Sequence, residues 1–282
     1  MTTPRGQTQP YAGRTPPMDP PPRDEMRGYE GRGLLEGERA LITGGDSGIG
    51  RAVAVAFAKE GADVAIAYLD EHDDARHTAG LVEEAGRTCV LLPGDLGGEH
   101  HCEDVVLRTV EELGGLDVVV PHHATQAPVE DLTDLTTEQL TRTFQVNVFS
   151  VFWVLRAAAR HLPDGGAIVI TGSVNGLRGN ASLIDYSCSK AAVMNLSSCL
   201  AQHYTGRGIR VNCVAPGPVW TPLIPATLPE EAVEGFGGQA PMGRPADPDE
   251  IAPSYVFFAS GRLSSYYTGE TLAPTGGEIQ AS

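Results

Sequence analysis

The sequence predicts an α/β fold built on a doubly wound parallel sheet, and three observations support this prediction. Short apolar segments, of the kind that form strands buried on both faces of a sheet, alternate with longer segments of helical length. One apolar segment runs directly into a glycine-rich turn and then into an amphipathic segment. The 282 residues are enough to bury a full core as one large domain. Alternation of this kind implies parallel strands joined by right-handed crossovers.

Seven strands and six helices are expected after residue 33, in one domain that spans residues 34–282. The strands are the short apolar runs at 39–43, 63–67, 88–92, 117–120, 167–171, 210–215 and 270–273. The helices lie between them, at 49–60, 74–85, 99–113, 145–161, 183–204 and 248–260.

Two of these helices have unusual sequences. Helix 248–260 starts at Asp247-Pro248-Asp249-Glu250, a capped start with proline at the first position, although Pro253 removes a backbone donor soon afterwards. Helix 145–161 is apolar on nearly every face, whereas a helix that covers a sheet needs only one apolar stripe. The surplus indicates a second buried contact, most simply another subunit.

Residues 1–33 form a different kind of chain, which we interpret as an N-terminal arm. Prolines mixed with glycine and charge leave almost nothing to bury, at positions Pro4, Pro10, Pro16, Pro17, Pro20, Pro21 and Pro22. Such a segment does not offset its ordering entropy alone. We expect an extended or disordered arm whose removal leaves the fold intact, with packing across a subunit interface as the alternative.

Charge and cysteine usage exclude several classes of protein. The net charge of −16 argues against nucleic acid as a partner, because phosphate binding needs clustered basic residues. Five scattered cysteines without C-x-x-C spacing indicate reduced thiols in a cytoplasmic protein. No apolar run reaches the length of a membrane span, so no membrane partner is expected.

The glycine-rich turn follows the first predicted strand, as Thr43-Gly44-Gly45-Asp46-Ser47-Gly48-Ile49-Gly50-Arg51. Glycines at 44, 48 and 50 let the backbone turn tightly and approach a pyrophosphate, whose charge is met by the N–H groups at the helix start. The pattern predicts a dinucleotide site, with a glycine-rich turn that binds no ligand as the alternative.

A tyrosine and a lysine lie four residues apart, as Tyr186 and Lys190 in one of the predicted helices. Lys59 and Lys190 are the only two lysines in the chain, and the other eighteen of its 20 Lys and Arg residues are arginines. Residues with this spacing share a helix face, so we expect the ammonium to lower the tyrosine pKa and make the phenol an acid or base usable near neutrality.

Together these motifs resemble those of the short-chain dehydrogenase/reductase family. The run Thr43-Gly44-x-x-x-Gly48-Ile49-Gly50 is followed by Asn147, Ser173, Tyr186-x-x-x-Lys190 and Pro216-Gly217-x-x-x-Thr221, in order and with suitable spacing. The resemblance covers residues 35 to the C-terminus and implies a Rossmann fold. Within the family, the chain resembles bacterial members with a long N-terminal extension, which are usually labelled uncharacterised oxidoreductases, aldehyde reductases or general stress proteins. This finer resemblance rests on the arm and on the turn 92–96.

The resemblance implies a role for each matching residue. Tyr186 becomes the proton donor or acceptor, Lys190 its pKa modifier and a ligand of the nicotinamide ribose, Ser173 a donor to the substrate carbonyl and Asn147 the support of a proton relay. The cofactor-binding residues that it implies are Gly44, Asp46, Ser47, Gly48, Ile49, Gly50, Tyr68, Asp95, Leu96, Ala124, Tyr186, Lys190, Pro216, Gly217, Val219 and Thr221. Family members commonly pair helix 145–161 and the next helix into tetramers, so a homotetramer is also implied.

One segment departs from the family pattern. Where Asn-Asn-Ala-Gly is usual, this chain has His122-His123-Ala124-Thr125, and the Thr125 side chain falls where glycine lets the cofactor lie close. Adjacent residues of an extended chain point to opposite faces, so the histidine pair is not a ready chelate and no metal site is predicted.

The favoured function is an NAD(P)-dependent oxidoreductase that transfers a hydride between a nicotinamide cofactor and a small carbonyl or alcohol substrate. The alternative is a non-catalytic, dinucleotide-sensing regulatory protein, favoured only by residues 122–125. The segment 218–245 is expected to form a lid with apolar contacts from Trp220, Leu223, Ile224, Leu228 and Phe236, but its sequence does not identify the substrate.

Cofactor preference depends on the segment after the second strand, Ala67-Tyr68-Leu69-Asp70-Glu71-His72-Asp73-Asp74. A 2′-phosphate needs nearby Arg or Lys, whereas a bare ribose diol accepts a carboxylate. Four acids and no Lys or Arg occur there, which favours NAD(H) over NADP(H); Arg51 is the nearby cation that would reverse this preference.

Overall fold

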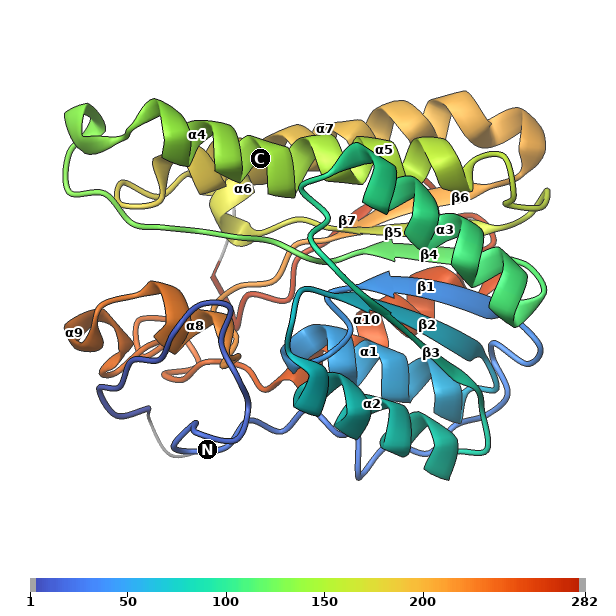
Figure 1. Cartoon of the computed structure of the whole chain (residues 1–282), viewed down its shortest axis with the longest axis horizontal. Coiled ribbons are helices and arrows are strands. Elements are labelled where there is room, and N and C mark those ends of the chain that lie inside the picture. Colours follow the sequence, from blue (N-terminus) through green and yellow to red (C-terminus); the bar gives the residue numbers. More distant parts are fainter. Residues whose placement is uncertain (1–3, 279–282) are drawn as a thin grey trace.

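Seven parallel strands form one sheet in the order β3-β2-β1-β4-β5-β6-β7, in a computed structural model that describes residues 4–278 (Figure 1). The sheet is therefore doubly wound, with the order reversing between β1 and β4. The strands are β1 (Arg39–Thr43), β2 (Asp63–Tyr68), β3 (Cys89–Pro93), β4 (Val118–Pro121), β5 (Ala167–Thr171), β6 (Arg210–Val214) and β7 (Thr271–Leu272).

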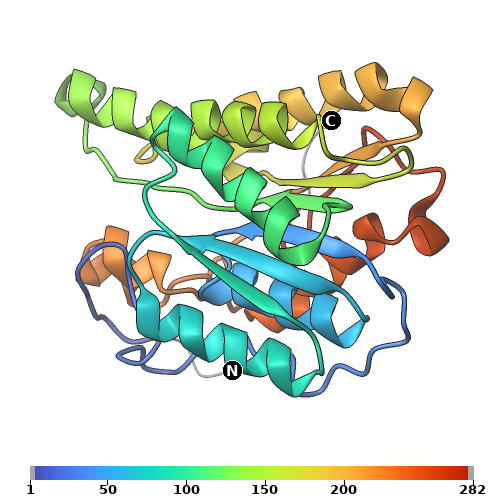
Figure 2. The ribbon, with the colours of Figure 1, turned by 45° about the vertical axis from the view of Figure 1, so that its right-hand side comes forward.

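Helices cover both faces of the sheet, as Figures 1 and 2 show from two sides. One apolar core lies under α1 (Gly48–Lys59), α2 (His72–Glu84) and α10 (Pro248–Ala259). A second core lies under α3 (Glu99–Leu113), α5 (Ser150–Ala158) and α7 (Ile184–Tyr204). The shorter helices are α4 (Thr137–Phe144), α6 (Val174–Arg178), α8 (Leu223–Thr227), α9 (Glu230–Val233) and α11 (Gly261–Ser264), with 3-10 turns η1 (Leu132–Asp134) and η3 (Thr205–Arg207).

The predicted elements are confirmed to within two residues at each end, apart from helix 145–161. Helix α10 starts with the predicted capping box, in which the Glu250 carboxylate accepts from the Asp247 N–H at 2.8 Å, and it continues through Pro253. The prediction for helix 145–161 was wrong at its start, because the helical segment begins at Thr137. Thr136 caps that start by accepting from the Gln139 N–H at 3.1 Å, a local capping pattern that the prediction did not use.

A π-helical turn, η2 (Gln145–Phe149), joins α4 to α5. Asn147 lies in this turn, where it is buried and bonds outward to neighbouring segments instead of to its own helix. Single π turns interrupt helices frequently at functional sites. The interruption therefore marks this position as part of a site.

The arm packs against its own chain, which differs from the expectation that it buries little. Met18 and Met26 are buried, and Met18 lies in a small apolar cluster with Trp220. Trp220 donates from its indole N–H to the Pro20 carbonyl at 2.7 Å. In Figure 1 the arm, drawn in dark blue, passes beside α8 and then beneath α1 and α2. Apolar residues spaced this widely along a proline-rich segment have no period to reveal them.

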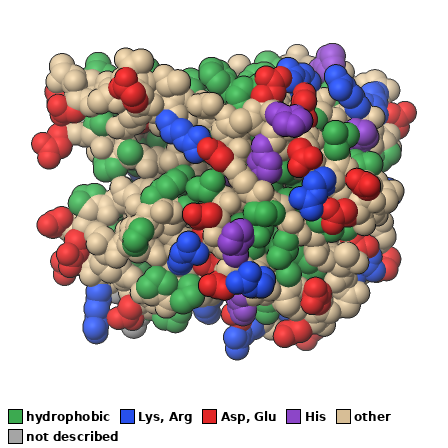
Figure 3. Space-filling view, viewed as in Figure 1, with side chains coloured by type: hydrophobic (Ala, Val, Ile, Leu, Met, Phe, Trp, Pro, Cys, Tyr) green, Lys and Arg blue, Asp and Glu red, His purple; other side chains and the backbone are tan. Residues whose placement is uncertain are grey.

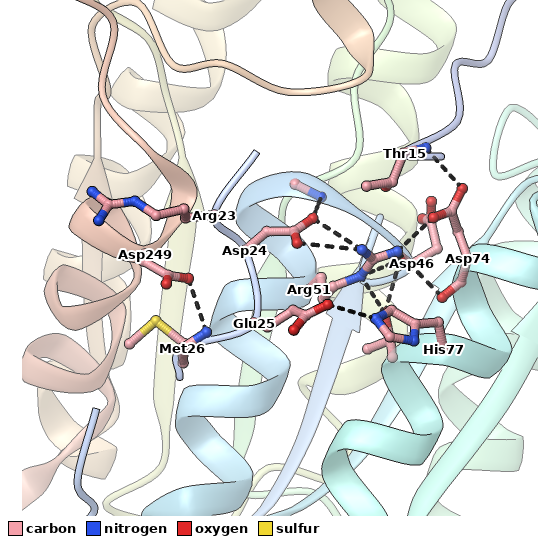
Figure 4. A network of polar contacts seen from close by, with 12 residues as sticks. Thr15, Arg23, Asp24, Glu25, Met26, Asp46, Arg51, Asp74, His77 and Asp249 are labelled. Carbon is pink, nitrogen blue, oxygen red and sulfur yellow. Dashed lines mark hydrogen bonds and ion pairs between the residues drawn. The ribbon is translucent and has the colours of Figure 1, made fainter. Parts of the chain in front are cut away.

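A buried ion network ties the arm to the first helix (Figure 4). The Arg51 side chain is 1% exposed and lies 3.1 Å from the Asp24 carboxylate of the arm and 2.6 Å from the Asp74 carboxylate of α2. It also donates to the Asp46 carbonyl at 2.9 Å and to the Thr78 hydroxyl at 3.0 Å. The arm is thus joined to the turn that precedes α1.

The surface shows no concentration of basic residues on the face drawn in Figure 3, where Lys and Arg are interspersed with Asp and Glu. Among residues 4–278, no helix combines the length and the apolar character that crossing a membrane requires.

Candidate active site

A cavity of about 840 Å³ lies at the carboxyl ends of the strands. Parallel α/β sheets bind their ligands at this edge. Of the residues predicted for the site, those that line the cavity are Gly44, Asp46, Ser47, Gly48, Ile49, Tyr68, Asp95, Leu96, Ala124, Ser173, Tyr186, Lys190, Pro216, Gly217, Val219 and Thr221. Gly50 and Asn147 are not among the lining residues and lie behind the wall.

The glycine turn has the conformation that its sequence predicts. Gly44 and Gly48 have φ angles of +71° and +53°, which residues with side chains rarely adopt. Gly50 has a different purpose, because a Cβ there would lie 1.8 Å from the Gly44 carbonyl oxygen. The start of α1 therefore packs directly against the turn, and its N-terminus faces the cavity, where an anion is favoured.

Ser173, Tyr186 and Lys190 line the same cavity from the end of β5 and from α7. Ser173 follows β5 and caps α6, with its hydroxyl oxygen accepting from the Asn175 N–H at 3.1 Å. Tyr186 and Lys190 lie one turn apart on α7, and the Lys190 Nζ is 5.9 Å from the centre of the Tyr186 ring. Lys190 also donates to the Thr171 carbonyl at 2.9 Å, which fixes the ammonium beside the end of β5.

Burial dominates the protonation of this pair. It raises the pKa of Tyr186, and the hydrogen bond with the Ser173 hydroxyl opposes that rise. It lowers the pKa of Lys190 to about 8. The lowered tyrosine pKa that we expected from the spacing is therefore not found, because desolvation disfavours both charged forms. Spacing on a helix predicted the proximity of the two groups but not the medium around them.

Asn147 braces the segment after β4. Its side-chain oxygen accepts from the Thr125 N–H at 2.7 Å, and its side-chain nitrogen donates to the Thr125 carbonyl at 2.8 Å and to the Ser189 hydroxyl at 3.0 Å. Both contacts with Thr125 go to its backbone, and Thr125 is not among the lining residues.

The two histidines are built into the wall as neutral hydrogen-bonding groups. His123 spans Thr43 and Ser150, with Nδ1 to the Thr43 hydroxyl and Nε2 to the Ser150 hydroxyl both 2.6 Å. His122 Nδ1 lies 3.1 Å from the Thr171 hydroxyl. Burial, followed by the charge of Lys190, lowers the pKa of both imidazoles to about 3. Within the described residues, no group of three or more His, Cys, Asp or Glu side chains is arranged to hold a metal.

The His123 pKa leads to a prediction about acid stability. A histidine whose pKa is about 3 when folded and 6.5 otherwise contributes stability above pH 6.5 that is lost as pH falls towards 3. When the pH falls from 6.5 to 5, the unfolding free energy of wild type should therefore decrease by about 2 kcal/mol more than that of His123→Asn. Urea unfolding at both pH values measures this. The exposed His100→Asn is the control, and an equal response of the two variants would contradict the assignment.

The end of the cavity near β2 is rich in acids. Burial, together with the charge of Glu71, raises the pKa of Asp46 to about 7. The Glu71 carboxylate is buried, with one oxygen accepting from the Asp70 N–H at 3.0 Å and the other without a hydrogen-bond partner among the described residues. Arg51 is turned away into the network with Asp24 and Asp74, so it is not free to meet a phosphate.

Several lining residues were missed from the sequence. Tyr11, Ala12 and Gly13 of the arm lie in the wall, as does Gln126, whose amide donates to the Thr227 hydroxyl at 2.9 Å. Of the expected lid residues, Leu223, Ile224, Leu228 and Phe236 line the cavity. Trp220 does not, because it is buried beneath the arm, so its assignment as a contact was wrong. Contacts between an arm and a distant lid leave no local pattern in the sequence.

Comparison with known proteins identifies the class to which this fold and site belong. The family described as "Enoyl-(Acyl carrier protein) reductase" matches residues 44–278. General stress protein 39 of Bacillus subtilis is 52% identical, covering 93% of this chain and 91% of its own. A solved short-chain dehydrogenase from Burkholderia cenocepacia, in complex with NADP, has a TM-score of 0.81 at 33% identity, covering 86% of this chain and 98% of its own. The chain belongs to the short-chain dehydrogenase/reductase family, whose members are NAD(P)-dependent oxidoreductases.

A plant relative adds a named activity. NADPH-dependent aldehyde reductase 1 of Arabidopsis thaliana, a chloroplast protein, is 42% identical and covers 93% of each chain. This relative is named for its use of NADPH, and the Burkholderia structure is a complex with NADP. Neither protein supports the NAD(H) preference that we drew from the acidic segment after β2.

Proposed function

We propose that the protein is a nicotinamide-dependent carbonyl reductase or alcohol dehydrogenase in which Tyr186 is the acid or base. The observation that carries this proposal is that Ser173, Tyr186 and Lys190 line the same cavity as the glycine turn. A dinucleotide laid across this cavity brings its nicotinamide to the tyrosine. The bound cofactor supplies or accepts the hydride, and the protein supplies orientation and proton transfer.

Each side chain has a defined task in this reaction. The Ser173 oxygen accepts from the Asn175 N–H, and its hydroxyl hydrogen, which is directed to the Tyr186 phenol here, turns to the substrate oxygen when a substrate enters. The Tyr186 hydroxyl gives that oxygen its proton during reduction and takes it during oxidation. Lys190 uses one N–H for the Thr171 carbonyl and has others for ribose hydroxyls. Asn147 acts through Thr125 as a positioning residue, and its support of a proton relay stays a prediction.

The dinucleotide-sensing alternative now has no observation in its favour. It rested on residues 122–125, where His123 hydrogen-bonds to both Thr43 and Ser150 and Thr125 is not among the lining residues of the cavity. Tight dinucleotide binding without turnover of any substrate would restore it.

The lid favours substrates with an apolar body next to the reacting carbonyl. Leu223, Ile224, Leu228 and Phe236 line the wall there, and Gln126 lines the same cavity. The named activity of the plant relative supports aldehydes as the first class to test. Steady-state rates with a panel of aldehydes, ketones and alcohols, each with NADPH and NADH, test the proposal. No turnover with any of them would contradict it.

We also propose that the protein is a homotetramer, as the apolar sequence of helix 145–161 and the family resemblance predicted. Phe149 of η2 and Phe152 of α5 are 48% and 49% exposed on one stretch of helix. Exposed aromatic pairs of this kind typify subunit contacts. Replacing both with serine should reduce the particle mass from a tetramer to a smaller species in light scattering after size exclusion. Leu132→Ser, at an exposed leucine of η1, should leave the mass unchanged, and an unaltered mass in both variants would contradict the interface.

A further inference from the structure

The N-terminal arm forms part of the wall of the cofactor cavity. Tyr11, Ala12 and Gly13 line it together with Tyr68 and Leu69 at the end of β2. This part of a dinucleotide site receives the adenine ribose, whose 2′ position distinguishes NAD(H) from NADP(H). The family match begins at residue 44, so the arm lies outside it.

The arm is fixed in this position at both ends of the segment 9–15. Gln9 donates from its backbone N–H to the Pro225 carbonyl at 2.9 Å and from its side chain to the Pro222 carbonyl at 3.2 Å. The Thr15 N–H donates to the Asp74 carboxylate at 3.1 Å. Gly13 packs so closely that a Cβ would lie 2.5 Å from the Pro222 oxygen. The segment therefore spans from the lid to the start of α2 in a defined conformation.

Arg14 directly follows the lining residues and points to the segment after β2. Its guanidinium is 3.8 Å from the Asp70 carboxylate, and both side chains are at least half exposed. An exposed pair at this distance is worth little, about 0–1 kcal/mol. The guanidinium is therefore held loosely enough to exchange Asp70 for a stronger partner, and a phosphate is one because it accepts two parallel N–H bonds.

Other cations near the cavity are already engaged. Arg51 is buried with Asp24 and Asp74. The lining residues Arg142 and Arg178 pair with Asp95 and Glu278. At the end of β2, the carboxylates of Asp46 and Glu71 in the cavity wall and of the neighbouring Asp70 would repel a 2′-phosphate. The exposed Arg76, whose charge reaches Tyr68, is paired with Asp73.

We propose that Arg14, from the N-terminal arm, is the residue that binds the 2′-phosphate of NADP(H) and so sets cofactor specificity. This inference rests on the proposed dinucleotide site and adds the arm to it. The positive charge for the phosphate then comes from the arm, about 55 residues before the segment after β2 that usually supplies it. NADP(H) would bind in this way although the segment after β2 is acidic.

The test compares Arg14→Gln with Arg27→Gln in the full-length protein. Arg27 is an exposed arm arginine paired with Glu25, which makes it a matched control. Dissociation constants for NADPH and NADH are measured by nucleotide fluorescence at one ionic strength. Arg14→Gln should weaken NADPH binding about tenfold and leave NADH binding within about twofold, because a charge-assisted contact to the phosphate is lost. Arg27→Gln should change neither constant.

A complementary variant tests the competition with Asp70. Asp70→Asn should strengthen NADPH binding and leave NADH binding unchanged, since it frees Arg14 and removes a repelling charge. An unchanged NADPH constant in Arg14→Gln overturns the proposal, as does an equal loss for both nucleotides, which would mean that Arg14 only shapes the wall. Binding of neither nucleotide by wild type would instead overturn the proposed function, so the two failures are distinguishable.

Discussion

Replacing Tyr186 with phenylalanine should reduce kcat by about 10²–10⁴-fold while nicotinamide cofactor affinity stays within about threefold of wild type. The phenol is the group placed to exchange a proton with the substrate oxygen, and the ring that packs beneath the cavity remains in the variant. Steady-state kinetics with an aldehyde that wild type turns over, together with cofactor titration, measures both quantities. Lys190→Ala should lower both kcat and the affinity for the cofactor, because Lys190 hydrogen-bonds to the end of β5 and lines the cavity.

The control for this experiment is Tyr204→Phe, the same substitution at the far end of α7. Tyr204 is not a cavity residue, so its loss should leave kcat near the wild-type value. If Tyr186→Phe kept most of the wild-type turnover, another group would have to be the acid, and the proposed mechanism would fail.

Much of the fold was predictable because its determinants are local. Buried strands such as β5 are continuous apolar runs, and four consecutive residues, Asp247 to Glu250, indicate the start of α10. The glycine turn is equally local, since Gly44, Gly48 and Gly50 serve backbone geometry within one strand–helix junction. Sequence motifs therefore predicted many of the residues that line the cavity.

The remainder depended on contacts between distant segments. Arg51 meets Asp24, 27 residues earlier, and Trp220 meets Pro20, 200 residues earlier, with no periodic pattern to link them. The described residues of the arm form no helix or strand, but its prolines did not reveal the apolar and charged side chains that the arm buries. Burial likewise decided the protonation of Tyr186 and Lys190, and burial is a property of the folded surroundings.

The buried network around Arg51 makes the arm part of the stability of the domain. Both Asp24 carboxylate oxygens accept from Arg51, at 3.3 and 3.1 Å, and one of them also accepts from the Gly48 N–H at 3.1 Å, at the first turn of α1. Two carboxylates, Asp24 and Asp74, thus face one guanidinium in a site that water barely reaches. Removing one partner of a buried ion pair lowers the stability by much more than the intact pair contributes to it. The charge that remains is buried, and water cannot replace its lost partner.

Asp24→Ala should therefore lower the free energy of unfolding by about 3 kcal/mol, the usual consequence of breaking a buried ion pair. Urea unfolding followed by circular dichroism measures this change. Asp19→Ala, which removes an exposed carboxylate from the same arm, should change it by no more than about 0.5 kcal/mol. In the double variant Asp24→Ala/Arg51→Met the loss should be smaller than the sum of the single losses, because each single variant already breaks the contact that Asp24 and Arg51 share. Equal unfolding free energies for Asp24→Ala and Asp19→Ala would show that the arm detaches without destabilising the domain and would restore the expectation of a dispensable arm.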